Sequence, residues 1–189
     1  MPKGHVYRKA WWTRHDRANH AFITDLQGLL RQYGKPVSRT LASLYRQEWP
    51  PGGLTVQVTA YANWAGAYST AGGLIVMASL DDETSGSAAF ETVFHEGMHQ
   101  WDDAMEDRIR QAAAQLHLEP PRDLSHALIF YTAGYVVSRI VPAHRPYGDA
   151  VWARGALPPR AQFDAHWLPY LRGETPLEAA LEQLILGLK

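Results

Sequence analysis

Two histidines four residues apart, with a glutamate directly after the first, are the residues of this chain best suited to chemistry. They are His95, Glu96 and His99, in the run HEGMH. On a helix, residues four apart lie one turn above each other, with about 5–6 Å between their Cβ atoms. Both imidazoles can then reach one metal ion at the roughly 2.0–2.1 Å of a Zn–N bond. The spacing therefore predicts a metal site with two histidine ligands.

Glu96 suits a different role from the histidines beside it. It is turned about 100° around the helix from His95, so its carboxylate reaches past the ion instead of binding it. A carboxylate in that position can take a proton from a water molecule that the metal activates. We expect Glu96 to act as the general base.

A helix over residues 88–106 is predicted to carry these three residues. Its large apolar side chains gather on one side, which we expect to be the buried side: Phe90, Val93, Phe94, Met98 and Trp101. His95 and His99 lie together beyond the edge of this stripe. The alternative is two histidines with ordinary hydrogen bonds, but their position beside the stripe favours a helix whose flank faces a cleft.

A third ligand must come from elsewhere in the chain. The sequence has no cysteine, so only His, Asp and Glu are available, and a catalytic zinc ion usually has three protein ligands. We predict His126, which opens a helix expected over residues 124–140. The other candidates are His117, His144, His166 and Glu106.

Geometry separates the acidic residues that follow His99. Glu106 lies about 10 Å along the axis from His99, too far to share its metal ion unless the helix breaks. Asp102 and Asp103 are closer and suit a supporting role, in which a carboxylate orients an imidazole N–H.

Hydrolysis also needs a hydrogen-bond donor for the developing oxyanion. Tyr131 is near His126 in sequence but about 140° away from it around a regular helix. Tyr147 is expected on a loop that can turn inward, and Tyr135 is a third candidate. We take Tyr131 and Tyr147 as the candidate catalytic tyrosines, although for any single tyrosine core packing with a satisfied hydroxyl is the stronger explanation.

The surrounding pattern is that of an α+β protein forming a single domain over residues 1–189. Helices are expected over 17–33 and 38–48, separated by a turn at 34–36. Residues 54–61 and 74–78 read as strands. We expect a small, mostly antiparallel sheet packed against several helices.

Residues 55–132 resemble the catalytic core of zincin metallopeptidases, most closely the gluzincin branch. The resemblance depends on the HEGMH run and on residues 63–68, which stand about thirty residues before His95, where gluzincins carry the edge strand that binds an extended peptide. It implies a zincin-like active-site helix, a Zn²⁺ ion as cofactor, and a peptide or protein as substrate, bound by strand addition.

Three features depart from known zincin branches. No downstream Glu-x-x-x-Asp stands at the gluzincin ligand spacing, which is why a histidine is predicted as third ligand. The Gly-x-Met-Glu-Asn segment of the aminopeptidases is missing. Gln100 and Trp101 follow the run directly, so the longer metzincin form with its glycine and third histidine is absent.

A zinc-dependent peptidase is the function that these features favour. Another zinc amidohydrolase is an alternative, although peptide deformylases need a cysteine ligand that this chain lacks. A non-catalytic zincin-fold module that binds peptides is a second alternative, against which the intact Glu96 counts.

Composition narrows the range of partners. Lys and Arg number 18 against 19 Asp and Glu, a net charge of −1, and no basic stripe suited to nucleic acid is present. No apolar run is long enough to cross a membrane. The chain can be a cytoplasmic protein or the mature form of an exported one, and its oligomeric state is open.

Overall fold

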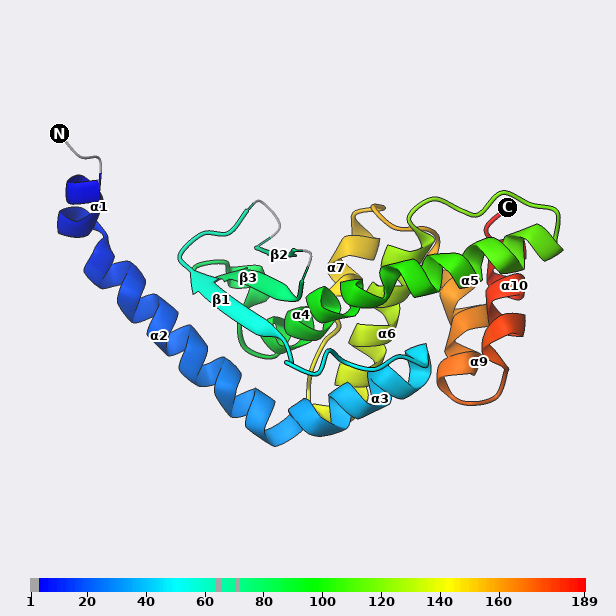
Figure 1. The fold of residues 1–189 in the computed structure, drawn as a ribbon, viewed down its shortest axis with the longest axis horizontal. Coiled ribbons are helices and arrows are strands. Elements are labelled where there is room, and N and C mark those ends of the chain that lie inside the picture. Colours follow the sequence, from blue (N-terminus) through cyan, green and yellow to red (C-terminus); the bar gives the residue numbers. More distant parts are fainter. Residues whose placement is uncertain (1–3, 64–65, 71) are drawn as a thin grey trace.

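The computed structural model describes residues 4–63, 66–70 and 72–189, and it has the predicted α+β architecture (Figure 1). Its longer helices are α1 (Gly4–Ala10), α2 (Trp12–Leu29), α3 (Lys35–Tyr45), α4 (Gly86–Met98), α5 (Asp102–Gln115), α6 (Leu124–Ile140) and α10 (Leu177–Gly187). The strands are β1 (Thr55–Thr59), β2 (Ala67–Ser69) and β3 (Leu74–Ala78). Short helices are η2 (Asp82–Thr84), α7 (Gly148–Ala153), α8 (Arg160–Gln162), η4 (Phe163–Trp167) and α9 (Leu168–Leu171).

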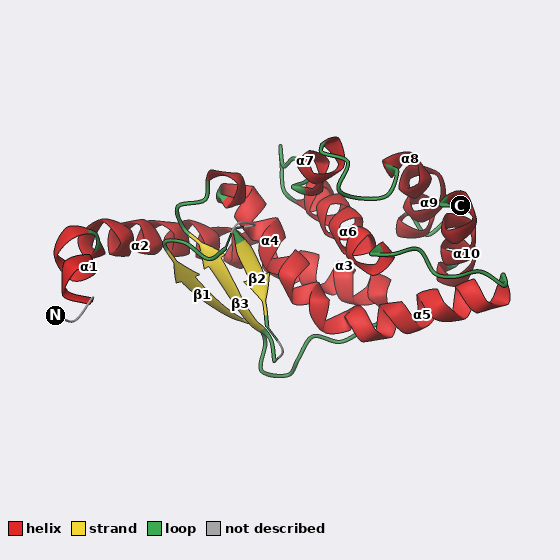
Figure 2. Ribbon diagram, turned by 90° about the horizontal axis from the view of Figure 1, so that it is seen from above, coloured by secondary structure: helices red, strands yellow, loops and turns green. Residues whose placement is uncertain are grey.

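The sheet is mixed, so the prediction of a mostly antiparallel sheet is wrong. Its order is β1-β3-β2, with β1 parallel to β3 and β2 antiparallel to β3. β3 takes the centre because it is apolar throughout, and its Ile75 and Met77 are fully buried. β2 is therefore an edge strand. The sheet lies against α2 and α4 (Figure 2).

The N-terminal helices form one bent rod instead of two helices separated by a turn. α2 passes into a π-helical turn, η1 (Leu30–Gly34), and then directly into α3, so the predicted helix end at residues 34–36 is wrong. Pro36, just after this turn, has no N–H to donate to the preceding turn of the rod, and proline and π-helical turns both cause bends of this kind. Figure 1 shows the change of direction at this turn.

The predicted active-site helix is bent as well. α4 ends at Met98, one 3-10 turn, η3 (His99–Trp101), follows, and α5 then runs on to Gln115. The five apolar side chains predicted to be buried are at most 5 % exposed, which confirms that prediction. Gly97 permits close packing on this side, because a Cβ there would lie 2.6 Å from the side chain of Leu54.

α6 is the second helix that positions the site, and its bounds are those predicted. It packs against α3, α4 and α5. The C-terminal segment from η4 to α10 covers α5 at the far end of the molecule from α1 (Figure 1). Within the described ranges, no helix combines the length and apolarity needed to cross a membrane.

Candidate metal centre

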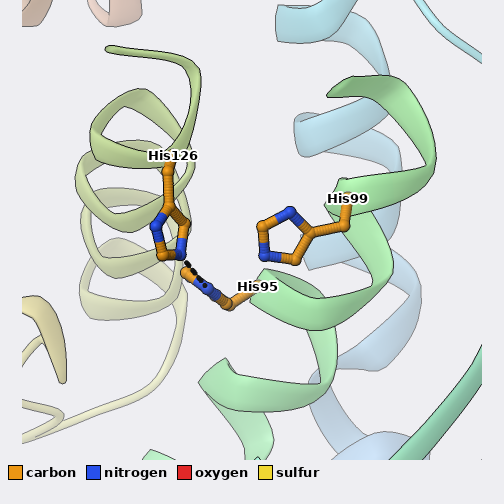
Figure 3. Close-up of side chains that lie close together, drawn as sticks. All are labelled: His95, His99 and His126. Atoms are coloured by element: carbon orange, nitrogen blue, oxygen red, sulfur yellow. Dashed lines mark hydrogen bonds between the residues drawn. The ribbon is translucent and has the colours of Figure 1, made fainter. Parts of the chain in front are cut away.

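Three histidines from two helices converge on one point (Figure 3). His95 lies in the last turn of α4, His99 opens η3, and His126 lies in the first turn of α6. Their ring centroids are 5.1 Å apart for His95 and His99, 5.2 Å for His95 and His126, and 5.1 Å for His99 and His126. This nearly equilateral triangle aims one nitrogen of each ring inward, and these three atoms lie within 4.8 Å of one another.

The spacing of the ligand atoms fits a metal ion. The Nε2 atoms of His95 and His126 are 3.3 Å apart. Two nitrogens bound to one tetrahedral zinc ion at about 2.0–2.1 Å would stand roughly 3.3–3.4 Å from each other. The histidine group can therefore hold a metal ion with little movement. Among the residues that the structure describes, this is the one group of His, Asp or Glu residues with such spacing.

The surroundings favour the neutral, metal-binding form of two of these imidazoles. Burial lowers the pKa of His95 well below its ordinary value, and the charges of His99 and His126 act in the same direction. Burial also lowers the pKa of His126, again helped by His99. A metal ion needs a deprotonated ring nitrogen, so these shifts reduce the competition from protons.

Asp102 orients His99 and ties the two helices together. Burial alone would lower the pKa of His99, but its hydrogen bond and attraction to Asp102 outweigh burial and raise it. The bond joins Nδ1 of His99 to Oδ2 of Asp102 at 2.7 Å, which leaves Nε2 for a metal ion. The other carboxylate oxygen accepts a 3.0 Å hydrogen bond from Ser125, the residue before His126.

Asp102→Asn is expected to weaken zinc binding by about 10–100-fold. The asparagine amide carries no negative charge, so it is a weaker hydrogen-bond acceptor for the Nδ1–H group of His99. Competition with a chelator of known zinc affinity measures the change. Asp103→Asn is the matched control: Asp103 was also predicted to support an imidazole, but it is exposed, and the carboxylate that bonds to His99 is that of Asp102. Equal zinc affinity for Asp102→Asn and the wild type would contradict this role of Asp102.

Glu96 lies beside the histidine group without belonging to it. Its carboxylate is held against the edge strand by hydrogen bonds from the side chain and the backbone of Ser69. Burial raises the pKa of Glu96, while the bonds from Ser69 and the charge of His99 offset part of the rise. The residue is only 9 % exposed, but it borders an open cleft.

The cleft in front of the histidine group has a volume of about 1510 Å³. β2 and η2 form one wall, and the other comes from α6, α7 and the residues after α7. Phe130, one helical turn after His126, forms part of the floor, with its ring 4.1 Å from that of His95 and 4.8 Å from that of His126. The histidine group thus has an apolar side and an open side, as ligand-binding pockets commonly do.

The three candidate tyrosines differ in their position relative to the cleft. Tyr147 lines the cleft. Tyr131 does not, and its hydroxyl donates a 2.6 Å hydrogen bond to Asp164 on the far side of α6, so its proposed catalytic role is not supported. Tyr131 and His126 are separated by about 140° around the axis of α6, which accounts for this orientation. Tyr135 also lies away from the cleft and is half-buried against the core.

The other candidate ligands lie elsewhere. Glu106 is exposed and forms a 3.3 Å ion pair with Arg110, His117 lies in the turn after α5, and His166 lies in η4. His144 is buried against Glu91. Trp64 and Ala65 of the predicted edge segment fall outside the described residues.

Sequence reasoning missed Ser69 and Phe130. Phe130 had a usable signal, since it stands four residues after His126 on a predicted helix and must share its face. Ser69 had none, because its contact with Glu96 depends on which strand forms the sheet edge.

Comparison of this chain with protein-family models, curated proteins and solved structures found no match. The functional assignment therefore depends on the geometry of the site.

Proposed function

We propose that this chain is a zinc-dependent peptidase, with His95, His99 and His126 as metal ligands and Glu96 as general base. The observation that carries the proposal is the convergence of three histidines beside a carboxylate at the floor of a large cleft. Three nitrogen ligands with an open side correspond to the usual arrangement of a catalytic zinc ion.

In the proposed hydrolysis, the zinc ion and the side chains have different roles. A zinc ion held there supplies Lewis acidity, which lowers the pKa of water to about 7 and polarises a carbonyl group. Glu96 accepts the proton of the attacking water and passes it to the leaving amine. Ser69 holds the Glu96 carboxylate toward the cleft, and the Phe130 ring packs against His95 from the side of α6.

The edge strand supports an extended peptide as substrate. Gly66 and Thr70 make backbone hydrogen bonds to β3, to Ala78 and Leu74 respectively. Because such pairs alternate along an antiparallel ladder, the backbone groups of Ala67 and Ser69 face away from β3. The hydrogen bond from the Ser69 backbone to Glu96 agrees with this direction. A peptide added along this edge would run beside Glu96.

The test is to incubate the zinc-loaded chain with a pool of unstructured peptides and to identify new termini by mass spectrometry. We expect cleavage that stops when a chelator removes the zinc and returns when zinc is restored. Peptides that bind and are never cut would favour a binding module. Hydrolysis of small amides, with all peptides left intact, would favour another amidohydrolase.

A further inference from the structure

A buried polar cluster lies one helical turn before His95, outside the cleft. The side chains of Glu91 and His144 are 1 % and 0 % exposed, and Oε2 of Glu91 lies 2.6 Å from Nε2 of His144. The other ring nitrogen of His144 lies 2.9 Å from the Ser87 hydroxyl. Buried ion pairs are weak contributors to stability, because desolvation offsets their attraction. The presence of this cluster is therefore better explained by the residues that it positions than by a contribution to stability.

The cluster holds the loop between α6 and α7 against the helix that carries the metal ligands. The backbone N–H of Tyr147 donates a 2.9 Å hydrogen bond to the same Glu91 oxygen that contacts His144. The loop, residues 141–147, is thus tied to α4 at two points. It also presses on α6, since a Cβ at Gly134 would lie only 2.7 Å from Pro146.

Tyr147 extends from this loop into the cleft. Its ring stacks on Phe130 at 6.2 Å, and the Phe130 ring packs on His95. Within the part of the chain that the structure describes, the Tyr147 hydroxyl has no hydrogen-bond partner. Burial, reinforced by Glu83 and Asp81, raises the pKa of Tyr147. The hydroxyl thus keeps its proton and can donate a hydrogen bond to a bound ligand.

We propose that Glu91, His144 and Ser87 are positioning residues that fix Tyr147 as the hydrogen-bond donor to the oxyanion formed from the scissile carbonyl. This inference rests on the proposed peptidase function. Glu91 acts on the backbone of Tyr147, and the stack on Phe130 sets the direction of its ring. Tyr147 donates a hydrogen bond without losing its proton, so Glu96 carries out the proton transfer alone.

The test is a double-mutant cycle on the full zinc-loaded chain, with kcat and KM measured for Tyr147→Phe, Glu91→Gln and the double variant. Loss of one oxyanion donor lowers kcat by about 10²–10³-fold, so we expect this from Tyr147→Phe with little change in KM. Glu91→Gln should lower kcat at least about tenfold in the wild type and less than about twofold in the Tyr147→Phe background. Equal losses in both backgrounds would overturn the proposal.

Ser87→Ala tests the same proposal if the Glu91 variant does not fold. It removes only the hydroxyl contact to His144 at the half-buried end of the cluster. We expect a several-fold loss of kcat that also disappears in the Tyr147→Phe background. Ser85→Ala is the matched control, because Ser85 is exposed and its hydroxyl contacts only the Asp82 backbone.

The failure of this proposal can be distinguished from the failure of the peptidase function. If the wild type does not cut peptides, the peptidase function itself is rejected. If the wild type is active and the losses in kcat are additive, only the positioning role is rejected.

Discussion

Glu96→Gln is expected to reduce peptide hydrolysis by about 10²–10⁴-fold while the chain still binds zinc. The loss is of the size that removal of a general base produces. The amide has nearly the volume of the carboxylate and can still accept a hydrogen bond from Ser69, so the packing around residue 96 is retained. Because Glu96 is outside the ligand group, zinc affinity should change little. Steady-state kinetics and metal analysis on the same sample measure both quantities.

Glu106→Gln is the matched control for this variant. Glu106 is exposed on α5, and its ion pair with Arg110 is remote from the cleft. Its replacement should leave kcat and KM unchanged. A Glu96→Gln variant that cuts peptides at the wild-type rate would remove Glu96 from the mechanism.

His126→Ala is expected to abolish both activity and tight zinc binding, because two histidines on one helix leave the ion without its third protein ligand. His126 is the most informative ligand to replace, since it is the least buried of the three histidines and comes from a different helix than His95. Zinc at a hundredfold excess over its Kd stabilises a folded protein by about 2.7 kcal/mol. For a chain of this length, that raises Tm by about 5–10 °C. The variant should lose most of this shift.

His20→Ala is the matched control for the ligand variant. The His20 side chain is 75 % exposed on α2 and contacts only Asp16 one turn earlier. Its Tm should rise with zinc as the wild type does. If His126→Ala kept the full zinc-dependent shift, the third ligand would have to be another residue.

The local parts of the fold could be predicted from the sequence. The strand at Leu74–Ala78 and the helix at Leu124–Ile140 have the predicted bounds, because a continuous apolar run and a helical repeat with flanking prolines specify them locally. The convergence of His95 and His99 follows equally from their spacing of four residues. His126 joins them because α6 packs directly against α4.

Long-range packing explains what sequence reasoning got wrong. The apolar run at Leu74–Ala78 fits a central strand, but nothing in residues 54–78 specifies the direction in which a neighbouring strand pairs with it, so the parallel pairing of β1 with β3 was missed. The turn predicted at residues 34–36 fails because Val37, Leu41 and Tyr45 form a buried stripe that keeps α3 helical from its first turn. Continued apolar spacing likewise concealed the bend at His99–Trp101, which allows Asp102 to reach back to His99.

Metal analysis of the purified chain tests the central claim most directly. The protein is prepared without chelators or affinity metals, its transition-metal content is measured, and the stripped protein is then titrated with zinc. One zinc ion per chain, bound by the wild type and not by His126→Ala, is the predicted result. A wild-type chain that contains no stoichiometric metal and takes up none during titration would contradict the account.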